Sequence, residues 1–380
     1  MKIVFTGGGT GGHFYPIIAI AEAMNTLVQE RRLIEPQLYF LAPDPYDQEA
    51  LFENGITFIR IRAGKWRRYF SLRNVSDTFV TLAGTVSALV TLFRLYPDVV
   101  VSKGGYGSMP TLIASRILRI PVVVHESDSK PGRASLYASR FAVKIALSYE
   151  NAAAYFSKKA QGRIARTGTP VRKALLHVEP EGAREYLKLE SGIPTVYITG
   201  GSQGSQKINE TVISALPSLV AFANVIHQTG EAHLESSQAI AQVILDKNPH
   251  ASRYHPFGFL SQLSLQRAAG IADLVISRAG TGTIAEISVW KKPSILIPIP
   301  EAVSHDQHGN AYAYARTGAA VVIEEGNLTP HLLASETERI IKDKAATARM
   351  SAAAARFTDP DAAKILASSI LAIALGHEYE

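Results

Sequence analysis

The stretch Gly7-Gly8-Gly9-Thr10-Gly11-Gly12-His13 decides the fold of this chain. It follows the apolar run Ile3-Val4-Phe5 and leads directly into a helical pattern that contains Pro16. Five glycines in six positions let the backbone turn sharply and approach a ligand closely. The first N–H groups of the following helix then point above the loop, which favours anionic or oxygen-rich groups. The stretch therefore predicts a strand, a glycine loop and a ligand-binding helix N-terminus, with His13 at the rim.

Apolar runs of strand length alternate with helical patterns along the rest of the chain. This alternation predicts an α/β fold with two Rossmann-like, doubly wound parallel-sheet domains that face each other across a cleft. The pattern changes around Thr167-Gly168-Thr169-Pro170. The expected strands, six on either side of this change, cover residues 2–6, 37–42, 56–61, 98–101, 121–125, 143–147, 194–199, 224–228, 254–257, 273–277, 294–298 and 320–324.

The domain boundaries follow from the same pattern. At 380 residues the chain is too long for one ordinary core. We expect an N-terminal domain over residues 1–168 and a C-terminal domain over 169–355. The last segment, 356–380, contains an Ala/Leu/Ile-rich helix at about 361–375, which we expect to pack near the cleft or back onto the N-terminal domain.

The composition excludes some kinds of site. There is no cysteine, so a disulfide framework, a thiolate metal site and a thiol nucleophile are all excluded. The N-terminus shows no apolar region typical of a signal peptide. Residues 1–168 hold 21 Lys and Arg against 12 Asp and Glu, a net of +9, and residues 169–380 hold 18 against 21, a net of −3. This asymmetry predicts that only the first domain meets an anionic surface.

Three further loops repeat the pattern of a strand end followed by glycines. They are Gly104-Gly105-Tyr106-Gly107-Ser108, Gly200-Gly201-Ser202-Gln203-Gly204-Ser205 and Arg278-Ala279-Gly280-Thr281-Gly282-Thr283. Ligands of open α/β sheets bind beyond the carboxyl ends of the strands, where all four loops are expected. We therefore expect a substrate between the domains, held by backbone amides from both sides.

Two of these loops could bind a nucleotide. Gly7, Gly9 and Gly12 satisfy G-x-G-x-x-G, and Asp44 could bind a ribose, which is a weak indication of a dinucleotide oxidoreductase. The bulky His13-Phe14-Tyr15-Pro16 and the late position of Asp44 count against it. The loop at Gly280 is more specific, because its amides could hold a diphosphate while Glu286, one turn later, accepts hydrogen bonds from ribose hydroxyls. Alternatively, Glu286 is simply an acid near a helix N-terminus.

Six motifs occur in one order between residue 3 and about residue 325: Gly8-Gly9-Thr10-Gly11-Gly12-His13, Gly104-Gly105-Tyr106, His125-Glu126, Thr169-Pro170-Val171-Arg172, Gly200-Gly201-Ser202-Gln203-Gly204, and Asp306-Gln307 with Asn310-Ala311. Together they resemble the MurG family, the peptidoglycan N-acetylglucosaminyltransferases of the GT-B fold. The resemblance implies inverting transfer of N-acetylglucosamine from UDP-N-acetylglucosamine to undecaprenyl-diphospho-muramoyl-pentapeptide (lipid I), which makes lipid II. It also implies no cofactor and no bound metal.

The resemblance further implies roles for individual residues. His13 and Glu126 are the candidates for the base that activates the acceptor's 4-hydroxyl, a role worth about 10²–10⁴-fold in rate. The acceptor's diphosphate is expected at Gly11, Gly104, Gly105 and Tyr106. The residues expected to bind the donor or another part of the substrates are Thr10, Gly11, Gly12, Asp128, Arg172, Ser202, Leu260, Thr281, Gly282, Thr283, Ile284, Ala285, Glu286, Asp306 and Gln307.

The motifs depart from the family in two places. The family usually reads His-Glu-Gln-Asn where this chain has His125-Glu126-Ser127-Asp128, and an acid in place of the amide changes how a sugar or acceptor is held. The family's Asp-His-Gln stands here as His305-Asp306-Gln307. A different lipid-linked or small acceptor, or a sugar-nucleotide-binding module without catalysis, stays open on this basis. Single residues also have structural alternatives: His13 as a helix cap, His125 as a structural hydrogen-bonder and Arg172 as a surface residue.

A basic segment in the first half indicates where a membrane could bind. Between Gly55 and Ser76 it contains Trp66, Tyr69, Phe70 and no acid, and its basic residues are Arg60, Arg62, Lys65, Arg67, Arg68 and Arg73. Each basic residue near an anionic lipid surface contributes about 1 kcal/mol. We expect peripheral binding of the N-terminal domain to the cytoplasmic face of the membrane, although a solvated loop is an alternative. We recognise no nucleic-acid module in the pattern and expect no nucleic-acid partner.

The helix that follows this basic segment is expected to be part of the core. Apolar residues recur on it at a spacing of three or four, at Phe79, Leu82, Val86, Leu89 and Phe93. Its uncharged part, residues 78–93, is shorter than a bilayer span requires.

Overall fold

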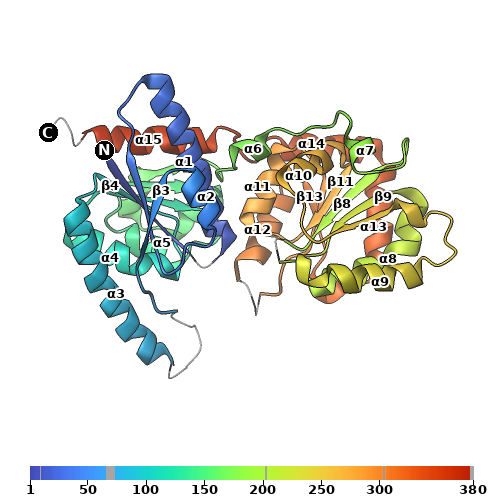
Figure 1. Cartoon of the computed structure of the whole chain (residues 1–380), viewed down its shortest axis with the longest axis horizontal. Coiled ribbons are helices and arrows are strands. Elements are labelled where there is room, and N and C mark those ends of the chain that lie inside the picture. The colour runs from blue at the N-terminus through green and yellow to red at the C-terminus, as the bar shows by residue number, and fades with distance from the viewer. Residues whose placement is uncertain (9, 66–72, 202, 302, 304, 377–380) are drawn as a thin grey trace. The chain divides into compact units, whose positions relative to one another are not determined.

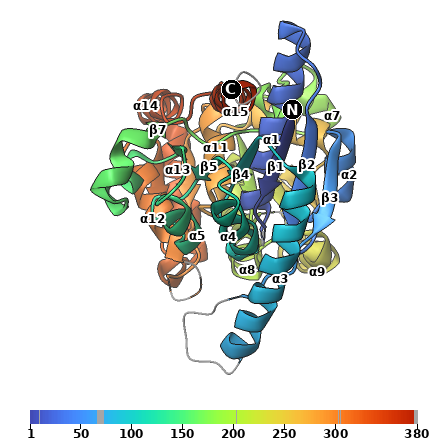
Figure 2. The same cartoon turned by 90° about the vertical axis from the view of Figure 1, so that its left-hand side faces the viewer.

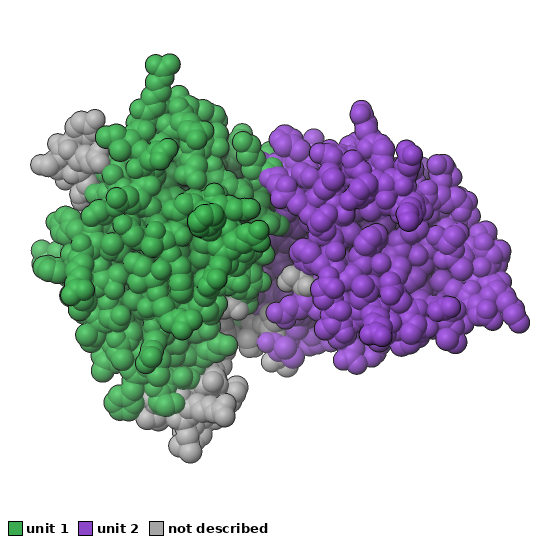
Figure 3. Space-filling view, viewed as in Figure 1, with its two compact units in different colours: residues 1–173, 359–380 green, residues 174–358 purple. Residues whose placement is uncertain are grey.

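The computed structural model describes all residues except 9, 66–72, 202, 302, 304 and 377–380. The chain forms two compact units (Figure 3). Unit 1 contains Met1–Lys173 and Asp359–Glu380, and unit 2 contains Ala174–Thr358. The division after residue 173 lies five residues beyond the predicted boundary at 168.

Unit 1 is built on a parallel sheet of seven strands within the described residues, in the order β3-β2-β1-β4-β5-β6-β7 (Figures 1 and 2). Its central strands β1, β4 and β5 are fully or almost fully buried because helices cover both faces. The strands are β1 Lys2–Thr6, β2 Gln37–Ala42, β3 Ile56–Arg60, β4 Val99–Ser102, β5 Val122–Glu126, β6 Lys144–Leu147 and β7 Ile164–Arg166.

The helices of unit 1 include one from the far end of the chain. Helix α15 packs against α1, and its Leu366, Ile370 and Leu371 belong to the same apolar core as Phe5 of β1. The C-terminal helix is therefore part of unit 1, which is one of the two positions that the sequence left open. The helices are α1 Gly11–Arg31, α2 Gln48–Glu53, α3 Arg73–Leu95, α4 Met109–Ile117, α5 Arg133–Ala138 and α15 Ala362–Gly376.

Unit 2 repeats the design with a parallel sheet in the order β10-β9-β8-β11-β12-β13. Its strands are β8 Thr195–Thr199, β9 Asn224–Gln228, β10 Tyr254–Phe257, β11 Leu274–Ser277, β12 Ser294–Leu296 and β13 Ala320–Val322. Its helices are α7 Ala183–Tyr186, α8 Gln206–Phe222, α9 Leu234–Ile244, α10 Gln262–Ile271, α11 Thr281–Val289, α12 His305–Ala315, α13 Pro330–Lys342 and α14 Lys344–Ala354, and α6 Lys173–Leu176 lies at the junction with unit 1.

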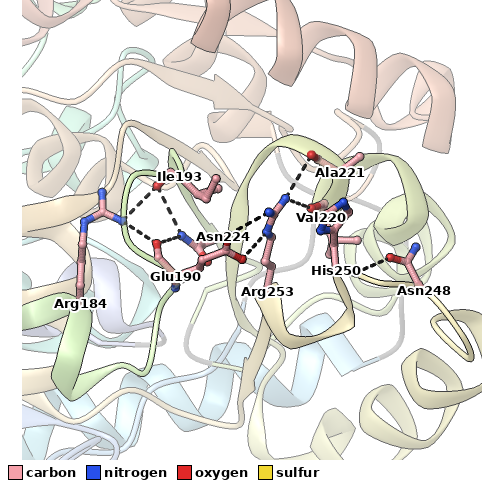
Figure 4. Close-up of polar contacts among 9 residues, drawn as sticks. All are labelled: Arg184, Glu190, Ile193, Val220, Ala221, Asn224, Asn248, His250 and Arg253. Carbon is pink, nitrogen blue, oxygen red and sulfur yellow. Dashed lines mark hydrogen bonds and ion pairs between the residues drawn. The ribbon is translucent and has the colours of Figure 1, made fainter.

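The entry of the chain into β8 is fixed by Arg253 (Figure 4). Its Nε and Nη2 atoms donate to the two carboxylate oxygens of Glu190 at 2.7 and 3.0 Å, and Nη1 donates to the carbonyls of Val220 and Ala221. Asn224 donates to the Glu190 carbonyl at 2.9 Å. This bidentate pair, supported by backbone acceptors, ties the segment before β8 to the end of α8.

Two sequence predictions about unit 1 were wrong. The sheet has a seventh strand, β7, at its edge, where the sequence predicted six strands. The predicted core stripe of α3 is mostly exposed: Phe79 is 68% exposed, Leu82 61%, Val86 56% and Phe93 72%. The buried face of α3 is instead made of small and apolar residues around Gly84, Thr85, Ala88 and Leu92, which lie toward α4 and the segment after β3.

Candidate active site

The first glycine loop of unit 1 leads from β1 into α1. Gly8 has a φ of 134°, which favours glycine, and Thr10 is the N-cap of α1. The Thr10 hydroxyl and the His13 Nδ1 lie 2.9 Å apart, so His13 is held at the helix entrance. Gly11 and His13 are half-exposed, and Gly12 is exposed. The loop thus presents the first turn of α1 and an imidazole together.

The second glycine loop, after β4, lies directly against the first. A Cβ at Gly105 would stand 2.6 Å from the Gly8 carbonyl oxygen, and Gly105 also has a φ of 78°. Only glycine satisfies both conditions without displacing the backbone. Tyr106 follows, and the Lys65 ammonium lies 5.2 Å from its ring centroid, within cation–π range. The predicted loop residues Gly104, Gly105 and Tyr106 therefore lie beside the first loop and the described end of the basic segment.

Glu126, the second candidate base, ends β5 and is 4% exposed. Its two carboxylate oxygens accept from the backbone N–H groups of Asp128 and Gly132, each at 3.0 Å. Burial raises the pKa of Glu126, and the nearby Asp128 carboxylate raises that pKa further. Glu126 therefore holds the loop that carries Asp128, whereas His13 is the more exposed of the two candidates.

His125 is buried, and each of its two ring nitrogens takes part in a hydrogen bond. Its Nε2 lies 2.9 Å from the carbonyl oxygen of Gly168, and its Nδ1 lies 2.8 Å from the Lys103 ammonium. These contacts agree with the structural alternative for His125. Lys103 itself was missed in the sequence, because it precedes the glycines of the second loop and matches no motif that we used.

Arg172 lies in unit 1, although the sequence placed it in the second domain. Its guanidinium lies 4.5 Å from the centroid of the Tyr15 ring in α1. The adjacent Lys173 N–H donates to the Glu22 carboxylate at 2.8 Å, which ties this segment to the same helix. A phosphate contact from Arg172 stays a prediction, and it would come from a guanidinium stacked on α1.

In unit 2, α11 offers an open helix N-terminus. A Cβ added at Gly280 or Gly282 would meet no atom of the described residues within 4 Å, so the described part of the chain leaves space at these positions. Gly282, Thr283 and Glu286 are half-exposed on one face. The side chains of Thr281, Ile284 and Ala285 are buried, so these three predicted residues have only their backbone to offer a ligand. The N–H groups and the carboxylate are thus presented together, as a diphosphate and a ribose require.

Gln228, at the end of β9, organises the loops around Leu260 and was missed in the sequence. Its Oε1 accepts from the Leu260 N–H at 3.3 Å, and its Nε2 lies 3.4 Å from both the Thr199 hydroxyl and the Gly201 carbonyl. The backbone of Leu260 is therefore joined to the glycine loop after β8. Ser202, in that same loop, lies outside the described residues.

Arg278 is a second organiser of unit 2. It donates to the Ser205 hydroxyl at 2.7 Å and to the Ile297 carbonyl at 3.2 Å, and it pairs with Glu325. One guanidinium thus joins the loops after β8, β11 and β12. A lone arginine before a glycine loop gives no sequence signal of this role.

Gln307 and Asp306 lie in the first turn of α12 and are half-exposed. The Gln307 Oε1 accepts from the Ile299 N–H at 3.2 Å, which fixes this turn to the segment after β12. Among the described residues, no three His, Asp or Glu side chains are grouped as a metal site requires.

The two halves of the chain match two halves of one enzyme family. Residues 3–147 match the glycosyltransferase family 28 N-terminal domain, and residues 195–366 match the glycosyltransferase family 28 C-terminal domain. The chain belongs to glycosyltransferase family 28. As a family 28 member it is a glycosyltransferase, so the dinucleotide interpretation of Gly7–Gly12 with Asp44 has no support.

Individual relatives agree with this family. The UDP-N-acetylglucosamine–N-acetylmuramyl-(pentapeptide) pyrophosphoryl-undecaprenol N-acetylglucosamine transferase of Treponema denticola is 34% identical over 87% of this chain and 85% of its own. The enzyme of the same name from Halothermothrix orenii is 34% identical over 97% of this chain and 98% of its own. The crystal structure of Acinetobacter baumannii MurG matches with a TM-score of 0.74 and 24% identity over 97% of this chain and 99% of that one. The predicted MurG family and GT-B fold class are confirmed.

Proposed function

We propose that this family 28 glycosyltransferase moves N-acetylglucosamine from UDP-N-acetylglucosamine to the 4-hydroxyl of the muramoyl sugar of lipid I, forming lipid II for peptidoglycan synthesis. The observation that carries the proposal is the 34% identity, over most of the chain, to enzymes named for this transfer. The presence of both family 28 domains in one chain supports it.

In the proposed reaction the acceptor's 4-oxygen attacks the anomeric carbon of the sugar, the bond to the UDP oxygen breaks, and a base takes the hydroxyl proton. One displacement inverts the anomeric carbon. His13 is the proposed base, because it is half-exposed beside two glycine loops. The departing UDP would be stabilised by the N–H groups at the start of α11, with Glu286 on the ribose and no resident metal.

The proposal includes peripheral binding of unit 1 to an anionic membrane, since lipid I is lipid-linked. Residues 76–95 of α3 meet the length and composition of a membrane span, contrary to our expectation, and 22% of that window is buried. Because one face of α3 packs against α4, we propose that the opposite face lies on the bilayer instead of crossing it. This exposed apolar face comprises Phe79, Leu82, Val86, Val90 and Phe93.

Basic residues accompany this apolar face. A Cβ at Gly84 of α3 would stand 1.8 Å from the Arg62 carbonyl oxygen, and the Gly64 N–H donates to the Thr81 hydroxyl at 3.1 Å. The segment that carries the exposed Arg60, Arg62 and Lys65 therefore runs along α3. Trp66, Arg67, Arg68, Tyr69 and Phe70 lie outside the described residues, as does the side chain of Arg73.

The transfer is tested by UDP release from purified protein. We expect release to require both UDP-N-acetylglucosamine and a lipid I analogue, to persist in EDTA, and to give a β-linked product by NMR. Loss of activity in EDTA would overturn the metal-free mechanism. Normal UDP-sugar binding with donor hydrolysis but no use of lipid I would indicate a different acceptor, and binding without any turnover would indicate a binding module.

A further inference from the structure

Lys103 is a buried ammonium at the centre of the unit 1 strand ends. It directly follows β4, which lies between β1 and β5 in the sheet, and its side chain is 1% exposed. The backbone N–H of Lys103 donates to the carbonyl of Thr6, the last residue of β1, at 2.9 Å. A buried ammonium is costly unless it is paired and hydrogen-bonded, so its partners indicate its purpose.

The contact with Lys103 helps to fix which ring nitrogen of His125 carries the proton. An ammonium can only donate, so the His125 Nδ1, 2.8 Å away, is an acceptor. The carbonyl of Gly168 can only accept, so the His125 Nε2, 2.9 Å away, carries the proton. Burial and the Lys103 charge keep the pKa of His125 well below its usual range. Lys103 thereby holds His125 of β5 neutral, in the tautomer whose Nε2 donates to the Gly168 carbonyl.

Lys103 also reaches the loop after β5. Its ammonium donates to the Ser127 hydroxyl, which lies between two acids, the buried Glu126 and the half-exposed Asp128. Burial lowers the pKa of Lys103 to about 8, and the charges of Glu126 and Asp128 act against that lowering. Burial and the Asp128 carboxylate raise the pKa of Glu126, and the Lys103 charge acts in the opposite direction.

We propose that Lys103 is a positioning residue of the unit 1 site: it holds His125 and Ser127 in place, and its charge favours the ionised forms of the two acids of the same segment, Glu126 and Asp128. The inference rests on the proposed function, because it assigns Lys103 to the acceptor side of the transfer. It touches neither the sugar nor the leaving group. Its effect is exerted through the Ser127–Asp128 loop, which the sequence predicts to hold a substrate.

The experiment compares Lys103→Met, which keeps the length of the side chain but removes its charge, with Lys144→Met, the same change at an exposed lysine of β6. We expect kcat/KM of Lys103→Met to fall at least tenfold at pH 7. We also expect the Glu126 and Asp128 carboxyl groups, followed by infrared difference titration, to protonate about one pH unit higher, since an opposite charge nearby shifts a carboxyl pKa by roughly one to three units. Adding Asp128→Asn to Lys103→Met should return the titration of Glu126 toward that of the wild type. Lys144→Met should leave both unchanged.

Asp128→Asn alone keeps the test decisive if Lys103→Met does not fold. With one carboxylate fewer, Glu126 should protonate at a lower pH, and no movement of its titration would overturn the inference. Unchanged carboxyl titrations in Lys103→Met would also overturn it. If the wild type does not use lipid I, the proposed function is wrong, but the inference about Lys103 is not overturned by that result. Infrared difference titration of the carboxyl groups, assigned with Glu126→Gln, then tests the charge coupling without turnover.

Discussion

The strand ends of the two units use the same backbone design for different purposes. In unit 1, the strand ends carry groups able to bind or release protons: Lys103, His125 and Glu126 are buried there, and His13 stands at the rim. In unit 2, α11 presents an open helix N-terminus. The difference suggests that unit 1 supplies the acid–base chemistry and unit 2 holds the anionic donor, so substitutions in the two units should affect different kinetic constants.

The largest effect is expected for His13→Ala, which removes the proposed base of unit 1. We expect kcat to fall by about 10²–10⁴-fold, the value of a positioned base, with the Kd for UDP-N-acetylglucosamine changed less than threefold. Steady-state transfer assays and calorimetric donor binding measure the two quantities. His331→Ala, at an exposed position of α13, is the control. A His13→Ala enzyme that retains its kcat would assign the base to another residue.

Glu286→Ala tests the complementary role of unit 2. If its carboxylate accepts hydrogen bonds from ribose hydroxyls, its loss should raise KM for the donor about 10- to 100-fold, since hydrogen bonds to a charged group contribute about 1.5–3 kcal/mol. The Kd for UDP should rise in parallel. Glu235→Ala, an exposed acid in the first turn of α9, controls for the alternative that any acid near a helix N-terminus suffices. Unchanged UDP affinity in Glu286→Ala would remove it from the donor site.

The sequence predicted twelve of the thirteen strands that the described residues form, because buried parallel strands are continuous apolar runs. It missed β7, since Ile164–Arg166 has three residues, one of them charged, at the sheet edge. Periodicity identified α3 but chose the wrong face. The sequence pattern of an apolar stripe is the same whether the stripe packs against protein or faces the surroundings. Here the buried face is made of small residues such as Gly84 and Ala88.

The candidate site was predictable only where glycines or a family motif marked it. The loops at Gly8 and Gly105 were anticipated because close backbone approach and positive φ require glycine. Lys103, Gln228 and Arg278 were not, because each acts through contacts with loops distant in the sequence. Single side chains that join several loops have no periodicity or spacing of their own. Their roles become visible only with the tertiary contacts.

Arg278→Ala should have a smaller effect on unit 2, because it loosens the loops without removing a group proposed to touch the donor. Losing its hydrogen bonds to Ser205 and Ile297 and its pair with Glu325 should lower the free energy of unfolding by about 1–3 kcal/mol. Denaturant titration measures this change, and donor KM should rise only a few-fold. A double-mutant cycle with Glu325→Ala isolates the ion pair. An additive cycle would show that the pair contributes no stability.

The smallest effect on catalysis with soluble acceptors is expected for Phe93→Ser in α3 of unit 1. This substitution should instead weaken the binding of the protein to membranes. Phe93 is 72% exposed, and Val243 on α9 of unit 2 is 76% exposed, which makes Val243→Ser a matched control. Burying a large apolar side chain contributes about 1.5–3 kcal/mol when complete. We therefore expect Phe93→Ser to bind vesicles of anionic phospholipid about tenfold more weakly in sedimentation assays, with Val243→Ser unchanged. Equal binding by the two variants would show that the exposed face of α3 is not the membrane-binding surface. The functional difference between the units would then be confined to their strand ends.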